Sequence, residues 1–453
     1  MELNLKEIIE AVEGEVLIQN ESEFNKICID TRKIQDKDIY LAIKGENFNG
    51  NSFVKEAFLK GATIAIIDEV LVDLEEIKDK GTIIKVKDTT KALLDLAYYY
   101  RKKLGLKVIG ITGSCGKTST KDLIAALLSD KYKVFKTKGN FNNQIGLPLM
   151  ILELDSTIDV AVLEMGMSDL GEIELLAKIA RPDIAVITNI GLSHIENLKT
   201  QDNIFKAKME ITNYLDENGV LIVNGEDKYL QKISNKGYEI KKIGYNHEYD
   251  VYAFNIILEE DKTIFTTCNG KKEEIFNIPI AGKHNVLNSM LAIEVAKNLN
   301  ISFNEMKKGL QNLEATSMRL QVIKKESIII INDCYNASPD SMKSSLDVLN
   351  TYKKGRKIAI LGTMKELGHK ALEAHKDVGN YAINKVDLLI AIGDYTSSFK
   401  EGFNKSNVLT FQTKEDFIEE MKNIIKKDDV ILVKASRGMK FENIVNSLEE
   451  VSI

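Results

Sequence analysis

The stretch Thr112-Gly113-Ser114-Cys115-Gly116-Lys117-Thr118-Ser119-Thr120 decides the fold of the central part of this 453-residue chain. It follows a short apolar run, Val108 to Ile111, and precedes a segment from Lys121 to Ser129 in which apolar residues recur at helical spacing. Strand, glycine loop and helix in this order are the context of a phosphate-binding loop. The glycines let backbone N–H groups approach phosphate oxygens, and the helix N-terminus adds partial positive charge.

The residue types in this loop indicate how a nucleotide would be held. We expect Lys117 to reach the outer phosphates and the Thr118 hydroxyl to bind Mg²⁺. The motif is shorter than the full GxxxxGK[ST] pattern, because Ile111 stands in the place of the first glycine. The alternative is an ordinary glycine turn followed by a solvated lysine, and the flanking strand and helix favour the nucleotide site. The residues expected to contact nucleotide phosphates are Gly113, Ser114, Cys115, Gly116, Lys117, Thr118 and Ser119.

The composition limits the class of protein. The length suggests about three domains, and 44% hydrophobic residues are enough for full cores. Lys and Arg number 61 against 67 Asp and Glu, a net charge of −6 that gives no basic surface for nucleic acid. No apolar run approaches the roughly 18 residues of a membrane span, and the N-terminus has no signal-peptide core. Four cysteines lie far apart without metal-ligand spacing, which indicates reduced thiols and a cytoplasmic location: Cys28, Cys115, Cys268 and Cys334.

The first part of the chain, residues 1–104, alternates short strands and helices and ends in a helix from Lys91 to Leu104. Polar residues gather directly after predicted strands, where an α/β unit binds its ligands. For Arg32 a surface ion pair is an equally good interpretation. The candidate ligand-binding residues of this part are Asp30, Thr31, Arg32, Asn49 and Gly50.

Two apolar runs in the central part end in polar residues. Asp159 to Leu163 stops at Glu164, and Asp183 to Ile187 is followed by Asn189 and His194. Continuous apolar runs fit central parallel strands, whose carboxyl ends meet at the ligand crevice, so these three polar residues should converge on the phosphate loop. A buried carboxylate beside phosphates suits a Mg²⁺ ligand. The alternatives are a capping or loop-exposed glutamate and a structural histidine.

Two more helices are predicted in the central part. One begins at Phe205 and carries Lys208; spacing alone gives it a solvated charged face. The other runs from Ser289 to Leu299, and His284 and Asn288 before it lie four residues apart and so share a face. An amide such as Asn288 can both donate to and accept from an adenine edge. Capping of the helix is an equally good interpretation for Asn285 and a poorer one for Asn288, which lies a turn inside.

The last part of the chain again alternates strand and helix, with strands at residues 327–331, 357–361, 386–392 and 430–433. Ser338 and Pro339 supply an N-cap and a first turn. The pattern predicts a small Rossmann-like unit without a GxGxxG loop. Taken together, the sequence predicts an α/β protein of three domains, at residues 1–104, 105–313 and 314–453, the central one with a mostly parallel sheet.

The order of motifs resembles the Mur ligases, and most closely the branch that adds D-alanyl-D-alanine. The motifs that carry the resemblance cover the whole chain: residues 112–122 (TGSCGKTSTKD), 142–148 (NNQIGLP), 164–167 (EMGM), 188–194 (TNIGLSH), 282–288 (GKHNVLN), 333–342 (DCYNASPDSM), 362–368 (GTMKELG) with His375, and 433–437 (VKASR). Three motifs depart from the family pattern: Asn49-Gly50-Asn51 stands for Asp-Gly-His, Ser338 for Asn, and Ala435 for Gly.

The resemblance implies an N-terminal UDP-sugar domain, a central ATPase and a C-terminal Rossmann-like domain. It also implies that Glu164, His194 and Lys208 join Thr118 as metal ligands, Lys208 after carbamylation, which needs a lysine of lowered pKa. Asn288 would read adenine, and Arg319 and Asp333 would complete the ATP site on domain closure. The further residues that it assigns to the substrates are Asn142, Asn143, Asn336, Ser338, Lys434 and Arg437, beside Asp30, Thr31, Arg32, Asn49 and Gly50.

The chemistry implied is ATP-dependent amide formation. The terminal carboxylate of UDP-N-acetylmuramoyl-tripeptide attacks the γ-phosphate, and the amine of D-alanyl-D-alanine then attacks the acyl phosphate, in peptidoglycan precursor synthesis. We expect a monomer with small-molecule substrates. Two other functions remain. One is a folylpolyglutamate synthase, which the separate N-terminal domain argues against. The other is a nucleotide-dependent switch or scaffold: a switch GTPase would need an Asn-Lys-x-Asp guanine motif, which is missing, and a scaffold could lose Glu164, His194 and Lys208, which are all present.

Overall fold

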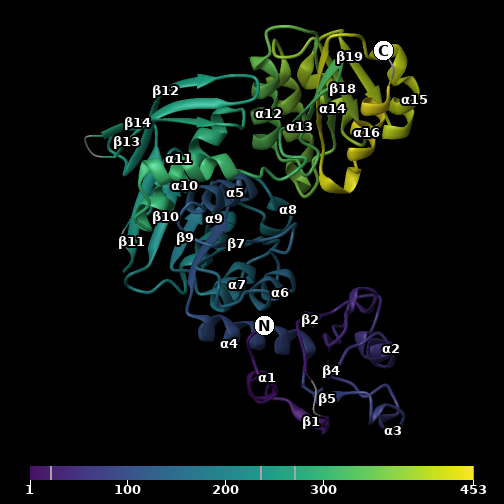
Figure 1. Ribbon diagram of the computed structural model, residues 1–453. Coiled ribbons are helices and arrows are strands. Elements are labelled where there is room, and N and C mark those ends of the chain that lie inside the picture. Colours follow the sequence, from purple (N-terminus) through teal and green to yellow (C-terminus); the bar gives the residue numbers. More distant parts are fainter. Residues whose placement is uncertain (21–22, 235–236, 270–271, 452–453) are drawn as a thin grey trace.

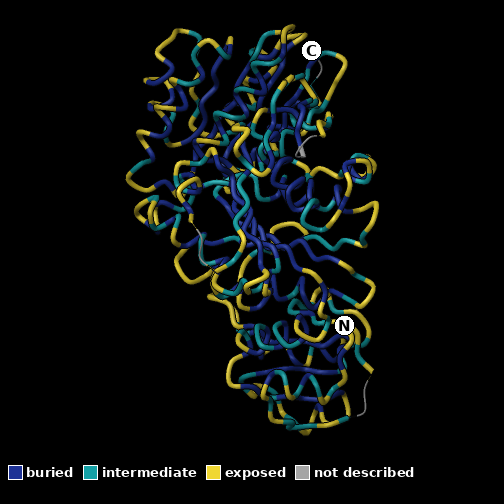
Figure 2. The backbone as a smooth tube through the Cα atoms, turned by 90° about the vertical axis from the view of Figure 1, so that its left-hand side faces the viewer, coloured by how far each residue is buried: buried dark blue, intermediate teal, exposed yellow. Residues whose placement is uncertain are grey.

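The computed structural model describes residues 1–20, 23–234, 237–269 and 272–451, which form an N-terminal, a central and a C-terminal lobe (Figure 1). Each lobe is built on its own sheet with helices packed against it, which confirms the predicted α/β class. Buried backbone runs through the middle of each lobe and exposed backbone lies on the loops around it (Figure 2). Among the described residues, no helix combines the length and apolar character that crossing a bilayer requires. All four cysteines are thiols, as predicted.

The N-terminal lobe is a small, mainly parallel sheet of order β1-β5-β4-β3-β2 in which β1 alone, among the described strands, runs antiparallel. Its strands are β1 (Glu15–Ile18), β2 (Ile27–Cys28), β3 (Ile39–Leu41), β4 (Ile64–Ile67) and β5 (Thr82–Lys85). Its helices are α1 (Leu5–Val12), α2 (Val54–Leu59) and α3 (Leu74–Ile77), with 3₁₀ turns η1 (Thr31–Lys33) and η2 (Gly50–Phe53).

The central lobe has the sheet order β14-β13-β12-β11-β10-β9-β6-β8-β7, parallel from β7 to β12 and antiparallel beyond. Its strands are β6 (Lys107–Thr112), β7 (Val134–Lys136), β8 (Val160–Glu164), β9 (Ile184–Ile187), β10 (Val220–Asn224), β11 (Glu239–Gly244), β12 (Val251–Leu258), β13 (Thr263–Asn269) and β14 (Lys272–Ile278). Its helices are α5 (Lys117–Leu128), α6 (Gly146–Leu152), α7 (Glu172–Ala180), α8 (Ile195–Leu198), α9 (Gln201–Met209), α10 (Lys283–Asn298) and α11 (Phe303–Gly309), with 3₁₀ turns η3 (Glu210–Thr212), η4 (Leu230–Lys232) and η5 (Leu310–Asn312).

The position of β6 between β8 and β9 explains where the site lies. Ile111 pairs in register with Glu164 of β8 and with Val186 of β9. Because the three strands are parallel, their carboxyl ends emerge side by side at one edge. The phosphate loop after β6 therefore lies between the polar residues that follow the two neighbouring strands.

The C-terminal lobe has the order β15-β16-β20-β17-β18-β19, parallel except for β15 at the edge. Its strands are β15 (Gln321–Lys324), β16 (Ile328–Asn332), β17 (Lys357–Gly362), β18 (Leu388–Ile392), β19 (Val408–Phe411) and β20 (Asp429–Lys434). Its helices are α12 (Pro339–Thr351), α13 (Ala371–Ala382), α14 (Thr396–Phe403), α15 (Lys414–Ile424) and α16 (Glu442–Glu450), with 3₁₀ turns η6 (Gly368–Lys370) and η7 (Arg437–Met439).

The predicted elements are largely confirmed, with two helix starts wrong: the helix expected from Ser289 to Leu299 is α10, which begins six residues earlier at Lys283 and has Gly282 as its N-cap. The helix expected to begin at Phe205 begins at Gln201, because the Thr200 side chain accepts a hydrogen bond from the Asn203 N–H and caps it. Lys208 is consequently in the last turn of α9, not in the first. Ser338 and Pro339 start α12 as predicted. The antiparallel extension β12–β14 was not foreseen.

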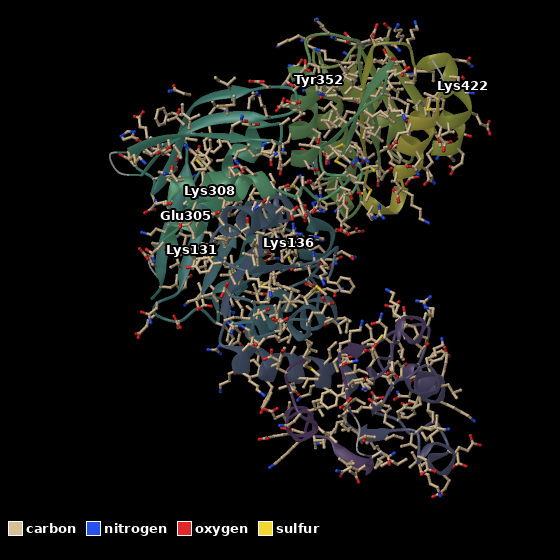
Figure 3. The ribbon with its side chains drawn as sticks, viewed as in Figure 1. Lys131, Lys136, Glu305, Lys308, Tyr352 and Lys422 are labelled. Atoms are coloured by element: carbon tan, nitrogen blue, oxygen red, sulfur yellow. The ribbon has the colours of Figure 1, made fainter. Side chains whose placement is uncertain are left out.

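The N-terminal and central lobes meet through α4 (Thr89–Leu104), which lies along the boundary in Figure 1 and packs on α1, α6 and α7. The Tyr100 hydroxyl donates to the carbonyl of Leu154, 2.6 Å away, and the Arg101 Nε donates to that of Ala180. The central and C-terminal lobes meet over the phosphate loop and again at Tyr352, labelled in Figure 3, whose hydroxyl donates to the Glu260 carbonyl.

Candidate active site

The phosphate loop can be built only with glycine at two positions. Gly113 has φ 148° and Gly116 φ 83°, a region that L side chains rarely adopt. A Cβ at Gly113 would lie 1.9 Å from the Thr188 Oγ1, and one at Gly116 would lie 2.7 Å from the Asn288 Oδ1. Backbone strain and close neighbours thus both exclude a side chain, as a loop that wraps a phosphate requires.

Residues after β9 hold this loop in place. The Asn189 carbonyl accepts from the Ser114 N–H at 3.1 Å, and the Asn189 Oδ1 accepts from the Cys115 N–H at 2.9 Å. The Ser114 Oγ in turn accepts from the Gly191 N–H at 2.8 Å. The predicted convergence of Asn189 on the loop is therefore confirmed. Its role is to fix the loop's backbone.

Glu164 and Thr118 form a buried oxygen pair at the start of α5. The Thr118 hydroxyl donates to the Glu164 Oε2 at 3.1 Å, and the Asn142 Nδ2 donates to the other carboxylate oxygen at 3.1 Å. Glu164 is 4% exposed, and no ion pair joins it to a described lysine, arginine or histidine. It is neither capping a helix nor exposed on a loop. Asn143, which follows Asn142 in the chain, does not contact Glu164 by a hydrogen bond. Its Oδ1 accepts from the Gly146 N–H and so shapes the start of α6.

Lys117 turns back over its own loop. Its Nζ donates to the Gly113 carbonyl at 2.7 Å. Burial lowers the pKa of the Lys117 ammonium, while the nearby Glu164 opposes that shift. The amine thus lies at the centre of the loop, within reach of a phosphate that the loop would surround.

His194 lines the same cavity but pairs with the C-terminal lobe. Its Nδ1 is 2.7 Å from the Glu366 Oε2. Among the described residues, no three His, Cys, Asp or Glu side chains are placed together to hold an ion, so no such group includes Glu164 or His194. The predicted metal set therefore remains a prediction.

Lys208 is buried without a partner. It is 1% exposed, and no hydrogen bond or ion pair of its side chain with another described residue is present. Burial, and next the positive charge of Lys117, lower its pKa well below the usual value for lysine. An amine in this setting is shifted toward its neutral form.

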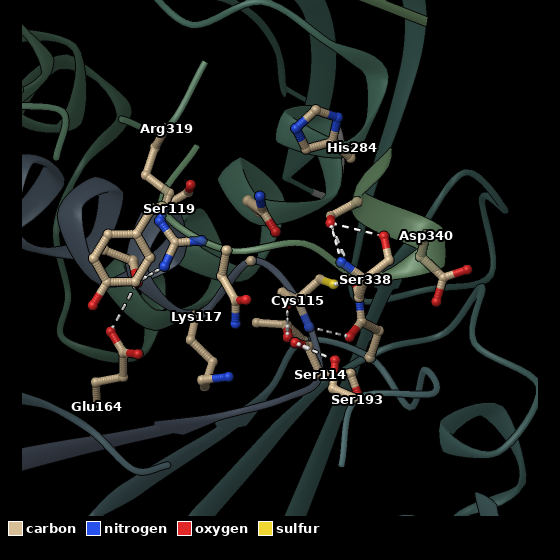
Figure 4. Close-up of a pocket in the computed structure, with 18 of the residues that line it drawn as sticks. Ser114, Cys115, Lys117, Ser119, Glu164, Ser193, His284, Arg319, Ser338 and Asp340 are labelled. Atoms are coloured by element: carbon tan, nitrogen blue, oxygen red, sulfur yellow. Dashed lines mark hydrogen bonds between the residues drawn. The ribbon is translucent and has the colours of Figure 1, made fainter. Parts of the chain in front are cut away.

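The C-terminal lobe closes directly over the phosphate loop (Figure 4). The Arg319 Nη2 donates to the Thr118 hydroxyl at 3.3 Å, and its guanidinium lies 4.2 Å from the centre of the Tyr335 ring. The Ser338 Oγ is 2.9 Å from the Cys115 Sγ. Two residues assigned to this lobe by the sequence thus touch the loop itself.

The other candidate residues of the C-terminal lobe lie just behind this contact. Lys434 and Asp333 form a buried ion pair at 2.5 Å, and the Lys434 Nζ also donates to the Asn336 carbonyl. Arg437 pairs with Glu442 at 3.1 Å and is half exposed. All four candidates (Asp333, Asn336, Lys434 and Arg437) line the cavity.

The cavity between these two lobes has a volume of about 540 Å³. It is lined by the phosphate loop and, from the predicted set, by Asn142, Asn143, Glu164, His194, Asn288, Arg319, Asp333, Asn336, Ser338, Lys434 and Arg437. His284 lines it too, on the face shared with Asn288, and burial lowers its pKa to about 4. The imidazole of His284, neutral near pH 7, and the amide of Asn288 therefore lie together on the wall of this cavity.

The candidate residues of the N-terminal lobe do not line this cavity. Arg32 is exposed and forms an ion pair with Asp30 at 2.8 Å, which is the surface arrangement considered for it above. Asn49 donates to the Glu69 carboxylate, and Gly50 has no room for a side chain because a Cβ would lie 2.5 Å from the Ile43 carbonyl oxygen. These residues belong to the N-terminal lobe and take no part in lining the cavity.

Sequence reasoning missed two residues of the site. Glu366, in a motif that was noted only for its family likeness, reaches His194. Tyr335 stacks on the Arg319 guanidinium. The signal for both was position: each follows a buried strand of the C-terminal lobe by a few residues, where ligand-binding side chains collect.

Known proteins are similar to this chain in sequence and in architecture. Three family models match: the Mur ligase family catalytic domain over residues 23–101, the Mur ligase middle domain over 111–296, and the Mur ligase glutamate ligase domain over 318–437. The chain is 41% identical to UDP-N-acetylmuramoyl-tripeptide–D-alanyl-D-alanine ligase of Bacillus subtilis, with 98% of each chain covered.

Solved structures agree with the sequence relatives. A crystal structure of MurF from Acinetobacter baumannii is 31% identical and superposes with a TM-score of 0.91 over 98% of each chain. MurF from Thermotoga maritima in complex with ADP is 28% identical, with a TM-score of 0.83 over 94% of this chain and 97% of that one. Identity above 30% along the whole length, with the same three-lobed fold, places this chain in the Mur ligase family.

Proposed function

We propose that this chain is an ATP-dependent ligase that joins the amine of D-alanyl-D-alanine to the terminal carboxylate of UDP-N-acetylmuramoyl-tripeptide, forming ADP and phosphate. The observation that carries the proposal is the placement of the phosphate loop between two lobes. Its Thr118 contacts the buried Glu164 of the central lobe, and its Thr118 and Cys115 contact Arg319 and Ser338 of the C-terminal lobe. A site divided between two lobes can bind ATP on one and present a second substrate from the other. The substrates follow from the relatives' names.

The chain's own residues would act mainly by positioning and charge neutralisation. The tripeptide carboxylate attacks the γ-phosphorus of ATP, and ADP leaves. The dipeptide nitrogen then attacks the acyl carbon, the carbon–oxygen bond to phosphate breaks, and the nitrogen loses its extra protons. Lys117 and Arg319 would neutralise the phosphate charge, and the C-terminal lobe would exclude water that would hydrolyse the acyl phosphate.

The oxygen atoms at the start of α5 fit Mg²⁺. Thr118 and Glu164 offer a hydroxyl and a carboxylate 3.1 Å apart, and the buried Glu164 forms no ion pair with a described residue. Mg²⁺ is usually held by one or two carboxylates together with substrate phosphates, so a larger protein cluster is not needed. When bound there it would supply charge neutralisation at the β- and γ-phosphates. His194 and a carbamylated Lys208 are proposed as further ligands.

The division of labour among the lobes is also part of the proposal. We assign the UDP-sugar to residues 1–104 through Asp30, Thr31, Arg32, Asn49 and Gly50, ATP to 105–313, and the dipeptide to 314–453 through Asn336 and Ser338. The distance of the first group from the cavity means that the sugar nucleotide must span the gap between lobes (Figure 1). We propose a monomer acting in the cytoplasm.

The decisive experiment measures phosphate release from ATP with each substrate omitted in turn. Release should need UDP-N-acetylmuramoyl-tripeptide and reach its full rate only with D-alanyl-D-alanine. Lys117→Ala should abolish release, and Lys131→Ala, an exposed lysine of the same lobe, should leave it unchanged. Release that responds to a folate and glutamate instead, or near-normal turnover by Lys117→Ala, would replace this proposal.

A further inference from the structure

His194 and Glu366 meet across the boundary between the central and C-terminal lobes. Their side chains approach to 2.7 Å, between the His194 Nδ1 and the Glu366 Oε2. A second contact lies beside the first, where the Glu196 N–H donates to the Glu366 backbone carbonyl at 3.1 Å. The loop that carries Glu366 therefore contacts the central lobe through both its backbone and its side chain.

The backbones of both partners are in a conformation that L residues avoid. His194 and Glu366 each have φ 65°, in the left-handed region. Gly368, with φ 48°, lies so close to the other lobe that a Cβ there would be 3.2 Å from the Glu196 Cα. Strained residues of this kind persist only where their surroundings hold them, and they gather at functional sites.

The turn that carries Glu366 is fixed from behind. His375 is fully buried; its Nε2 accepts from the Met364 N–H at 2.8 Å and its Nδ1 donates to the Ala371 carbonyl at 2.7 Å. The Lys365 N–H donates to the Ser436 Oγ at 2.9 Å. Glu366 is thus presented by a rigid turn, although its own side chain is half exposed.

The pairing determines which nitrogen of His194 is available. A carboxylate only accepts, so the Nδ1 of His194 must carry the proton. In the neutral ring the Nε2 then keeps its lone pair, and no hydrogen bond of the Nε2 with another described residue is present. Because His194 lines the cavity, that nitrogen is the one a ligand in the cavity can use.

We propose that Glu366 is a positioning residue that the C-terminal lobe supplies to His194 of the central lobe, fixing the imidazole with its Nε2 open to the nucleotide and its metal ion. The site for metal-bound nucleotide then reaches full affinity only while the two lobes are in contact. This inference rests on the proposed function for the identity of the ligand. Carboxylates that orient a ligating histidine typically change metal affinity or activity by tenfold or more.

The test is equilibrium binding of ADP with Mg²⁺, measured by calorimetry on the full-length protein without either ligase substrate. Glu366→Ala should weaken binding about tenfold, and Glu366→Gln, whose amide oxygen still accepts from the Nδ1–H, should stay within about threefold of the unmodified protein. Glu373→Ala is the matched control, because Glu373 is an exposed residue of the same lobe paired only with Lys370 among the described residues. In the presence of EDTA the loss caused by Glu366→Ala should shrink.

A double variant separates positioning from a general structural effect. His194→Ala combined with Glu366→Ala should bind no more weakly than His194→Ala alone, because the carboxylate acts through the imidazole. Additive losses, or Glu366→Ala binding as tightly as Glu373→Ala, would overturn the inference. If Glu366→Ala did not fold, Glu366→Asp carries the same test, since the shorter side chain cannot reach Nδ1. Dipeptide-dependent phosphate release with unaltered ADP binding would refute only this inference and leave the proposed function intact.

Discussion

At the scale of single residues, the central lobe contains a buried carboxylate and a buried amine that no ion pair joins to a described residue. Glu164 is a buried carboxylate that accepts hydrogen bonds from Thr118 and Asn142 but forms no ion pair with a described residue, and Lys208 is a buried amine without an acceptor among the described residues. Each would be costly in a protein that did nothing with it, because an isolated buried charge loses its hydration. Their presence within one lobe, near Lys117, supports the proposal that a metal ion completes the first and a carbamate the second.

The lysine gives a direct prediction. Lys208→Ala should remove ligase activity while leaving the protein as stable as before or more so, because an unpaired buried amine is lost. A small carboxylic acid added to the assay should restore part of the activity by occupying the place of a carbamate. Steady-state phosphate release and a thermal melt measure the two effects.

Lys206→Ala is the control for that prediction, since Lys206 lies two residues away on the exposed side of α9. Full activity of Lys208→Ala without any added acid would rule out a carbamate at this position.

Residue identities were predicted well where chemistry follows from type and strand position. Asn189 was expected at the loop and is there. Asn142 was expected to contact a substrate, which stays a prediction, and in the structure its side chain donates to the Glu164 carboxylate. Arg32 shows the limit of such reasoning, because an ion pair with Asp30 and a ligand contact need the same residue type. Sequence cannot choose between them, since the choice depends on what approaches the side chain.

At the scale of elements, the C-terminal lobe contains a buried histidine with a structural task. His375 on α13 accepts from the Met364 N–H, and burial lowers its pKa to about 4. In the unfolded chain a histidine binds its proton near pH 6.5. Between these values the unfolded state binds more protons, so the free energy of unfolding falls as the pH is lowered through 6.5 and is fully retained above it.

This predicts a pH-dependent stability that one substitution should remove. Lowering the pH from 6.5 to 5 should reduce the free energy of unfolding by about 2 kcal/mol through the protonation of His375 in the unfolded chain. His375→Gln should be less stable than the unmodified protein at pH 7.5 but should lose less on acidification. Calorimetric unfolding temperatures at pH 7.5 and 5.0 measure the difference.

His369→Gln, an exposed position of the same lobe, should follow the unmodified protein at both pH values. Equal losses on acidification for His375→Gln and the unmodified protein would show that His375 does not remain neutral in the folded lobe.

At the scale of the whole molecule, α4 is the element that joins two lobes. Tyr100 and Leu96 are fully buried, and Arg101 donates to the Ala180 carbonyl of the central lobe. A boundary drawn after residue 104, although consistent with the alternation of strands and helices, therefore assigns to the N-terminal lobe a helix that covers α6 and α7.

Fragments with and without this helix should differ in stability. A fragment of residues 105–453 would expose the surface that α4 covers, and each large apolar side chain uncovered costs about 1.5–3 kcal/mol. A fragment of residues 87–453 keeps α4 with its Asp88 cap. The shorter fragment should therefore unfold at a lower temperature and aggregate more readily, as measured by circular dichroism and light scattering. Equal unfolding temperatures would mean that α4 does not stabilise the central lobe and that the boundary after residue 104 is correct.

The sequence by itself determined the phosphate loop, the parallel strands around it and the residue types at their ends. These features follow from local rules: glycine backbone freedom, apolar periodicity and capping. It did not determine the Glu366–His194 contact, the placement of Ser338 on Cys115, or the separation of Arg32 from the cavity. Each of these depends on how one lobe packs against another. Such packing is a sum of many small contacts between distant segments, and no single motif encodes it, so only the tertiary structure could decide it.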